Sequence, residues 1–232
     1  MNRKIEIFMA VVMLGVLCML CFGMDNVKAK SGSDLKQGKF TVVLDAGHGG
    51  VDPGKVGVNG CIESEINLEI VKKMASYLEG EGIDVVLTRT DENGLYDENA
   101  SNKKKSDMNK RCEMIEEINP DLLISIHQNS YSSEGVKGAQ VFYYKGSKEG
   151  EKLATLLQDR LIKDVDPENG RECKDNNNYY IIKNVECPAV IVECGFLSNY
   201  SEAELLTSAD YQEKIARAIG SGVIDYLENS KR

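Results

Sequence analysis

Histidines His48 and His127 are the first candidates for chemistry, because they are the only two histidines among the 232 residues. Each comes at the end of a short apolar run, in the segments VVLDAGHGG and LLISIHQNS. A single histidine is most often a satisfied core residue, but two in equivalent positions beside small or polar residues favour function. Imidazole is the commonest protein ligand for metal ions. The pair therefore predicts a metal site.

A site with two histidines needs a third ligand, since catalytic zinc usually has three protein ligands and a water molecule. A carboxylate is the natural choice, and Glu63, Glu65 and Glu193 are the candidates by position. A glutamate that does not bind the metal can act as a base, because zinc lowers the pKa of bound water to about 7. The chemistry that this predicts is hydrolysis of an amide or ester. The chain has no HExxH motif, so the ligands must come from separate elements.

The elements that must bring these residues together alternate between strands and helices. Strands are predicted at 41–44, 83–87, 121–126, 138–144 and 188–192, helices at 63–80, 107–118, 148–163 and 210–227, and an exposed loop at 91–106. This alternation predicts a single α/β domain with a mostly parallel twisted sheet of about six strands and helices on both faces. Ligands of such sheets bind at the carboxyl ends of the strands. The ends of three predicted strands carry His48, His127 and Glu193.

The composition excludes several classes of protein. With 42% hydrophobic and 28% charged residues, the chain is an ordinary globular protein, which excludes a disordered chain and a multi-span membrane protein. Its 28 basic and 37 acidic residues give a net charge of −9. Because like charges repel, we expect no nucleic-acid partner.

The first 29 residues have the pattern of an export signal, with a basic start, an uncharged run at 7–24 and small residues near a cleavage point. The run is also close to the length of about 20 residues that a membrane-spanning helix needs. We therefore expect a signal peptide or N-terminal membrane anchor at 1–29, a linker at 30–38 and the folded domain at 39–229. The domain is expected to be extracytoplasmic, either secreted or anchored to the membrane.

Cysteines offer a rival chemistry. The residues beyond position 29 contain an odd number of cysteines, with no disulfide or CxxC framework in their spacing. Cys61 lies near Glu63 and Cys194 follows Glu193, so a cysteine hydrolase with a histidine base is the alternative to the metal site. Sensitivity to chelation or to alkylation would separate these two hypotheses.

Four segments of the chain resemble the signature blocks of the zinc-dependent N-acetylmuramoyl-L-alanine amidases of family 3, which are cell-wall hydrolases. They are VVLDAGHGGVDPG at 42–54, ESEINLEI at 63–70, LLISIHQNS at 122–130 and VIVECGFLSN at 190–199, in the order of the family. The resemblance implies that 39–229 is the amidase catalytic domain and that Zn²⁺ is its cofactor. It implies peptidoglycan as the substrate, cleaved at the amide between the lactyl group of muramic acid and L-alanine.

The resemblance also implies the ligand set of the zinc ion, which is His48, Glu63 and His127. Glu63 is chosen over Glu65 because the family ligand stands four residues before an asparagine that matches Asn67.

Two further residues receive roles from the same comparison of motifs. Glu193 matches the catalytic glutamate of the family, which acts first as a general base and then as a proton donor. Asn129 is expected to orient His127 or to contact the substrate, and a role in a turn is the alternative.

The short chain, its N-terminal segment and the polar segment at 91–106 look like the germination-specific amidases of spore-forming bacteria. Such enzymes remove peptides from muramic acid in the spore cortex, and a deacetylase then completes the muramic-δ-lactam. This implies a location in the forespore intermembrane space or the cortex. A vegetative autolysin with the same chemistry is the alternative.

The ligand set and the N-terminal segment also predict partners for this chain. A site with two histidines and one carboxylate can hold zinc loosely, which leaves room for an exported activating protein that orders it. The membrane is a further partner if the N-terminal segment stays uncleaved. The non-enzymatic alternative is an inactive peptidoglycan-binding domain, but the complete ligand set and Glu193 argue against it.

Overall fold

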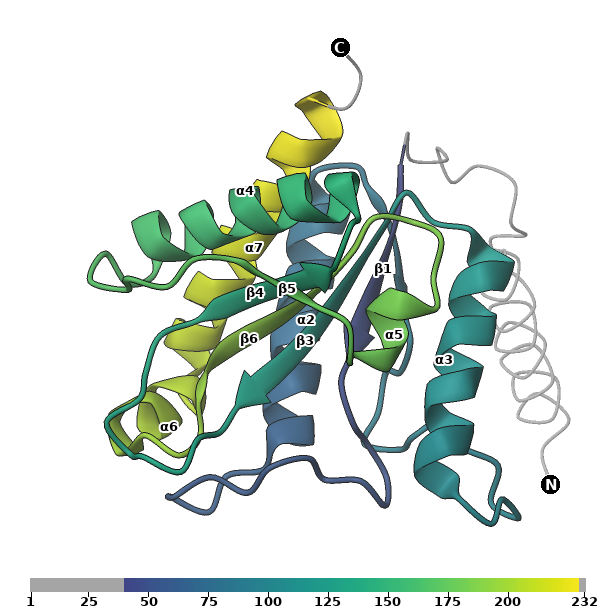
Figure 1. The fold of residues 1–232 in the computed structure, drawn as a ribbon, viewed down its shortest axis with the longest axis horizontal. Coiled ribbons are helices and arrows are strands. Elements are labelled where there is room, and N and C mark those ends of the chain that lie inside the picture. Colours follow the sequence, from purple (N-terminus) through teal and green to yellow (C-terminus); the bar gives the residue numbers. More distant parts are fainter. Residues whose placement is uncertain (1–39, 230–232) are drawn as a thin grey trace, which may run out of the picture. The chain divides into compact units, whose positions relative to one another are not determined.

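Six strands form one sheet in the computed structural model, which describes residues 40–229 (Figure 1). The predicted signal or anchor at 1–29 and the linker at 30–38 lie outside the described residues. The strands are β1 (Thr41–Ala46), β2 (Asp84–Leu87), β3 (Leu122–Asn129), β4 (Gln140–Tyr144), β5 (Lys174–Asn176) and β6 (Ala189–Phe196). Their order is β2-β1-β3-β6-β4-β5, and only the β4–β6 pair is antiparallel. The predicted, mostly parallel sheet is confirmed.

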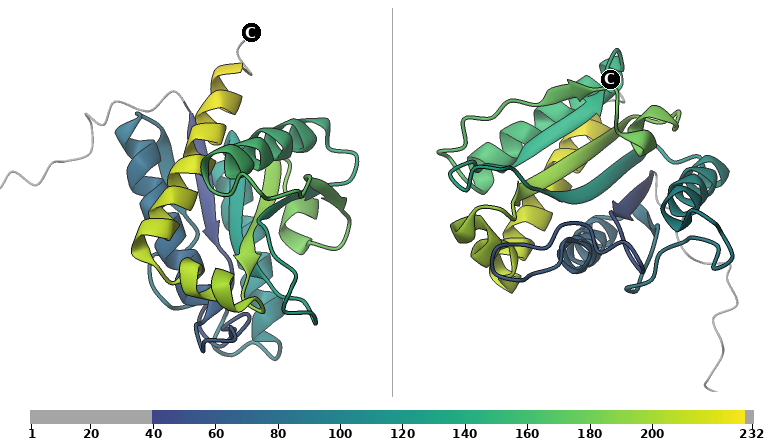
Figure 2. Two further views of the ribbon diagram at one scale, coloured as in Figure 1. Left: turned by 90° about the vertical axis from the view of Figure 1, so that its left-hand side faces the viewer. Right: turned by 60° about the horizontal axis from the view of Figure 1, so that its bottom comes forward.

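Helices cover both faces of this sheet, as predicted. One face packs against α2 (Glu63–Gly80), α4 (Lys148–Asp164) and α7 (Ala209–Asn229), whose long yellow ribbon crosses the sheet in Figure 2. The other face packs against α3 (Lys103–Ile118) and the short α5 (Tyr180–Lys183), while α6 (Tyr200–Leu206) follows β6. Among the described residues, no helix is both long enough and apolar enough to span a membrane.

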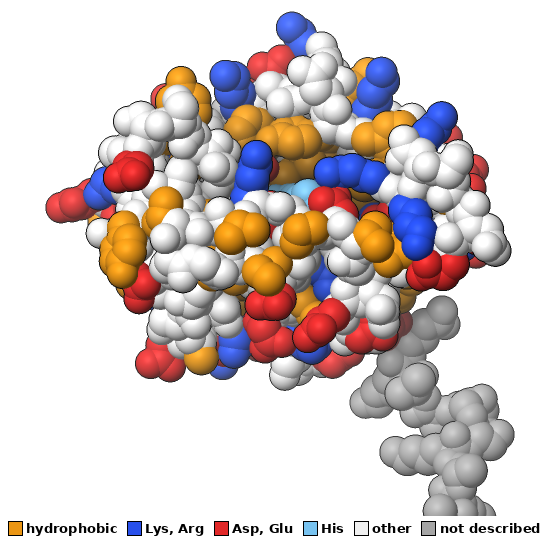
Figure 3. Space-filling model, turned by 90° about the horizontal axis from the view of Figure 1, so that it is seen from below, with side chains coloured by type: hydrophobic (Ala, Val, Ile, Leu, Met, Phe, Trp, Pro, Cys, Tyr) orange, Lys and Arg blue, Asp and Glu red, His pale blue; other side chains and the backbone are white. Residues whose placement is uncertain are grey.

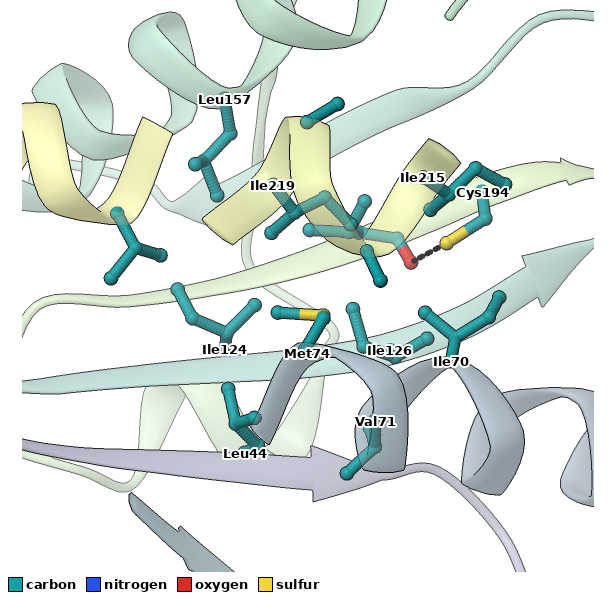
Figure 4. Packing of buried hydrophobic residues seen from close by; sticks show 14 of the residues in the cluster. Leu44, Ile70, Val71, Met74, Ile124, Ile126, Leu157, Cys194, Ile215 and Ile219 are labelled. Atoms are coloured by element: carbon teal, nitrogen blue, oxygen red, sulfur yellow. Dashed lines mark hydrogen bonds between the residues drawn. The ribbon is translucent and has the colours of Figure 1, made fainter. Parts of the chain in front are cut away.

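The main core lies between the sheet and the helices α2, α4 and α7 (Figure 4). Helix α2 contributes Ile66, Ile70 and Met74, which are all buried and lie at i, i+4 and i+8, so the helix predicted at 63–80 is confirmed with its apolar face toward the sheet. Ile124 of β3 and Ile219 of α7 pack into the same cluster. Since this helix begins at Glu63, its packing fixes the place of that carboxylate beside the sheet.

The alternation of side chains along β6 decides which of its residues lie on each face of the sheet. Val190, Val192 and Cys194 point into the main core, whereas Ile191 belongs to the smaller cluster under α3 and α5. Because successive side chains of a strand point to opposite faces, Glu193 lies on the α3 and α5 side of the sheet.

Some boundaries differ from those expected. Helix α3 begins at Lys103, inside the segment predicted as loop, because the side chain of Asn102 caps it by accepting a hydrogen bond from Lys105 N at 2.9 Å. Strand β5 and helix α6 lie where no such element was predicted, and β5 is a polar edge strand without an apolar pattern. His127 and Glu193 lie within their strands, near the carboxyl ends, and not just after them.

Candidate active site

The predicted functional residues meet in one cavity of about 410 Å³ at the carboxyl ends of β1, β3 and β6. His48 follows β1, His127 belongs to β3, Glu193 belongs to β6, and Glu63 is the first residue of α2. Histidine side chains are visible in a hollow on this end of the molecule, between lysine or arginine side chains (Figure 3). The parallel strands therefore bring together residues that are far apart in the sequence, as the sequence predicted.

Glu63 lies between the two imidazole rings. Its Oε1 atom is 3.1 Å from His48 Nε2 and 3.0 Å from His127 Nδ1. One potential ligand atom from each of the three residues lies within 4.8 Å of the other two. Two imidazole nitrogens and one carboxylate oxygen are a usual donor set for catalytic zinc. The remaining candidate, Glu65, is exposed on α2 and is not part of this cluster.

The surroundings of the three side chains also suit a metal. Glu63 is only 2% exposed, and its oxygens accept hydrogen bonds from Lys55 N at 2.8 Å and Gln128 N at 3.1 Å. Burial alone would raise the pKa of Glu63, but the hydrogen bonds and charges of the two histidines lower it, so the carboxylate is ionised. His48 Nδ1 lies 2.9 Å from Asp52 Oδ2, which is the carboxylate–histidine arrangement common around metal ligands. The residues therefore fit a zinc ion.

Glu193 lies directly opposite His127 in the register of β3 and β6 and is 6% exposed. Its Oε1 atom accepts a hydrogen bond from Tyr179 Oη at 3.0 Å, whereas its buried Oε2 atom has no hydrogen-bond partner among the described residues. Burial raises the pKa of Glu193, although the charge of His127 opposes this shift, while Glu63 adds to it. A carboxyl group with a raised pKa is suited to take up and return a proton near neutral pH.

Asn129 also lines the cavity, where its Oδ1 atom accepts a hydrogen bond from Ser130 N at 2.8 Å. Its proposed action on His127 or on the substrate stays a prediction. Asn67 is the residue by which Glu63 was chosen over Glu65 as the expected ligand. It donates a hydrogen bond to Gly47 O at 3.1 Å and so ties α2 to the loop that carries His48.

The cysteines do not support a thiol mechanism. Cys194 packs into the main core on the face opposite Glu193, and its Sγ lies 3.7 Å from Val192 O (Figure 4). Burial raises the pKa values of the Cys194 and Cys61 thiols, which disfavours the nucleophilic thiolate. All five cysteines of the described part are free.

A buried network beneath the site was missed by the sequence reasoning. Arg111 of α3 donates hydrogen bonds to Ala46 O at 2.8 Å and to His48 O at 2.6 Å, and it pairs with Asp45. Arg89 donates to Ala46 O at 2.9 Å. Burial alone would raise the pKa of Asp45, but the charge of Arg111 and hydrogen bonds from serine and threonine lower it to about 2. Arg111 lies in a highly charged stretch, so its type and spacing gave no signal that it is buried.

Comparisons with known proteins agree with this arrangement. Residues 42–225 match the family described as N-acetylmuramoyl-L-alanine amidase. The germination-specific N-acetylmuramoyl-L-alanine amidase of Bacillus subtilis is 37% identical over 189 residues, which cover 80% of this chain and 79% of that protein.

Two solved structures are similar in fold and sequence. The CwlD amidase from Clostridioides difficile, in complex with the GerS lipoprotein, has a TM-score of 0.79 and 40% identity over 82% of this chain and 98% of its own. An N-acetylmuramoyl-L-alanine amidase from Clostridium difficile 630 has a TM-score of 0.73 and 30% identity over 82% and 97%. The resemblance seen in the four sequence blocks is confirmed, and the chain belongs to the N-acetylmuramoyl-L-alanine amidase family.

Proposed function

We propose that this amidase is zinc-dependent, with His48, Glu63 and His127 as the ligands and Glu193 as the group that transfers protons. The convergence of three donor atoms within 4.8 Å at the end of the sheet carries the proposal. A zinc ion bound there supplies a Lewis acid that polarises the scissile carbonyl and lowers the pKa of water. The ionised, hydrogen-bonded state of Glu63 favours binding of a cation.

Glu193 would act in both steps of the reaction, first as a base and then as an acid. Its unpaired Oε2 atom takes a proton from the attacking water and returns it to the nitrogen of the leaving L-alanine. The C–N bond breaks, the lactyl group leaves as a carboxylate, and the stem peptide leaves with a free amino terminus. The raised pKa of Glu193 supports this double role, because the group must accept a proton and then give it up.

The test is to incubate the purified full chain with peptidoglycan, with and without added zinc, and to count new L-alanine amino termini by mass spectrometry. Zinc-dependent release is expected. Release that persists after complete removal of metal would overturn the proposed zinc dependence. No release from a chain that binds one zinc ion would point to a missing activator or a cortex-specific substrate.

Two variants test the residue roles in the same assay. Glu193→Gln is expected to keep its zinc and its fold but to lose about 10²- to 10⁴-fold in turnover, the usual contribution of a general acid–base group. His127→Ala is expected to lose both zinc and activity. Stoichiometric zinc in His127→Ala, or undiminished turnover in Glu193→Gln, would mean that the assigned roles are wrong.

We further propose that the substrate is spore-cortex peptidoglycan and that the enzyme prepares muramic-δ-lactam. The similarity to the germination-specific amidase of Bacillus subtilis supports this role. Expression of the chain in Bacillus subtilis that lacks its own germination-specific amidase is expected to restore cortex muramic-δ-lactam, as measured by mass spectrometry, whereas Glu193→Gln is not. Hydrolysis of vegetative wall without restoration of the lactam would favour the autolysin alternative.

The domain at 39–229 is proposed to act outside the cytoplasm, because its relatives include LytH of Staphylococcus aureus, which is described as a probable cell-wall amidase. Residues 1–29 would serve as the signal peptide or membrane anchor, and N-terminal sequencing of the exported protein distinguishes the two. The complex of the CwlD amidase with the GerS lipoprotein supports an exported activating partner for this chain as well.

A further inference from the structure

We propose that Tyr179 is a positioning residue that orients the carboxylate of Glu193, so that Oε2 is the oxygen presented to the reaction. This inference rests on the proposed role of Glu193. It adds a residue from the segment between β5 and α5, which carries none of the five predicted functional residues.

The hydroxyl of Tyr179 contacts one oxygen of Glu193 and leaves the other free. Tyr179 Oη donates to Glu193 Oε1 at 3.0 Å, and Oε2 is buried without a partner in the described part of the chain. Both residues line the same cavity as the two histidines. A phenol has an ordinary pKa near 10, so the hydroxyl carries its single proton at neutral pH and donates one hydrogen bond.

The ring of Tyr179 is itself held in place, as a positioning residue must be. It packs edge to face on Phe142 of β4, with the ring centroids 5.4 Å apart and an angle of 66° between the rings. The backbone N of Tyr179 donates to Asn176 Oδ1 at 3.2 Å, next to the end of β5. The hydroxyl therefore projects from a segment that is anchored to the same sheet as Glu193.

The last torsion of a glutamate side chain is soft, because rotation of the carboxylate about it has broad minima. Without a hydrogen-bond donor, the carboxylate would rotate about this torsion, and either of its two oxygens would then face the cavity. A hydrogen bond from a fixed donor to Oε1 breaks this symmetry, and a bond to a charged oxygen is stronger than one to a neutral group. Loss of the donor should therefore slow the proton transfer without changing how the substrate binds.

The neighbouring Tyr180 offers a matched control. Its hydroxyl donates to Asn109 Oδ1 on α3 at 2.9 Å and is not directed at Glu193. Removal of either hydroxyl leaves an aromatic ring and takes away one hydrogen bond. Only the removal at Tyr179 changes the environment of Glu193.

The experiment compares Tyr179→Phe, Tyr180→Phe and the unchanged chain in kcat, KM, zinc content and Tm. Tyr179→Phe is expected to lower kcat by about 10- to 100-fold, the factor for one hydrogen bond to a charged group, with KM and zinc content unchanged and only a small decrease in Tm. Tyr180→Phe should match the unchanged chain in kcat. An unchanged kcat in Tyr179→Phe would overturn the inference, and so would a kcat loss that comes with lost zinc, because lost zinc indicates a structural role.

A double-mutant cycle tests whether Tyr179 acts through Glu193. Glu193→Asp shortens the side chain, so its carboxylate no longer reaches the hydroxyl, and Tyr179→Phe should then have little further effect on kcat. An equal loss in both backgrounds would overturn the inference. Full activity of Glu193→Gln would instead overturn the proposed function, whereas an inactive Glu193→Gln with a fully active Tyr179→Phe would overturn this inference alone.

Discussion

At the scale of single residues, His127, the proposed zinc ligand, depends on the absence of a side chain at Gly47. A Cβ atom at Gly47 would lie 2.3 Å from Cε1 and Nε2 of the His127 ring, closer than any real contact of this kind. The ring packs on the backbone there and turns its Nδ1 toward Glu63. The glycine therefore supplies the space in which the ligand is oriented.

We predict that Gly47→Ala displaces the His127 ring and weakens zinc binding by about 10- to 100-fold, the range found when a group that orients a metal ligand is lost. Competition with a chelator measures the zinc affinity. The control is Gly80→Ala at the end of α2, where a Cβ would meet nothing within 4 Å. Alanine at position 80 should leave zinc affinity unchanged, and equal affinities of the two variants would contradict the prediction.

At the scale of elements, the buried guanidinium of Arg111 ties helix α3 to the end of β1. Arg111 is 1% exposed and contacts Asp45, Asp107 and the carbonyl of His48. His48 has a positive φ of 64°, a conformation that non-glycine residues seldom adopt. The hydrogen bond from Arg111 to its carbonyl helps to hold that conformation and so links the position of α3 to the position of His48, a proposed zinc ligand.

We predict that Arg111→Ala lowers the free energy of unfolding by about 3–5 kcal/mol, because it leaves Asp45 buried without its partner. Urea unfolding of the metal-free chain measures the loss. The control is Arg160→Ala, which removes a pair with Asp225 between α4 and α7. The Arg160 side chain is 30% exposed, so its loss should cost at most about 1 kcal/mol. Losses of the same size in the two variants would count against the buried network.

The elements also show what the sequence could predict. Apolar periodicity was sufficient to predict every strand of the sheet except β5, helix α2, and the approach of His48, His127 and Glu193, because buried runs and strand ends have local signatures. The contacts of Asp52, Tyr179 and Arg111 had no local signature in the sequence. Each is a polar residue whose partner is distant in sequence or set by a loop, so only the folded chain decides whether it is buried or solvated. Strand β5 was missed for a related reason. It is held in the sheet by backbone pairing with β4, and its polar side chains give no apolar pattern.

At the scale of the whole molecule, the buried network makes the stability of the fold depend on pH. The pKa of Asp45 is lowered from 3.8 to about 2 in the folded chain. A carboxyl whose pKa is lower in the folded state stabilises the fold above its unfolded pKa and loses that contribution as pH falls through its folded pKa. At about 1.4 kcal/mol per pKa unit, the shift corresponds to about 2 kcal/mol. This contribution should be complete at neutral pH.

We predict that the free energy of unfolding falls by about 2 kcal/mol between about pH 4 and pH 2 through Asp45 alone. Urea unfolding across this range, with a chelator present, measures the total slope. Asp45→Asn has no carboxyl to protonate, so its slope should be smaller by that amount, although it is less stable at every pH. Glu63 also has a lowered pKa, but it titrates in both chains and cancels in the difference. Parallel curves for the two chains would show that acid acts on the fold through other carboxylates.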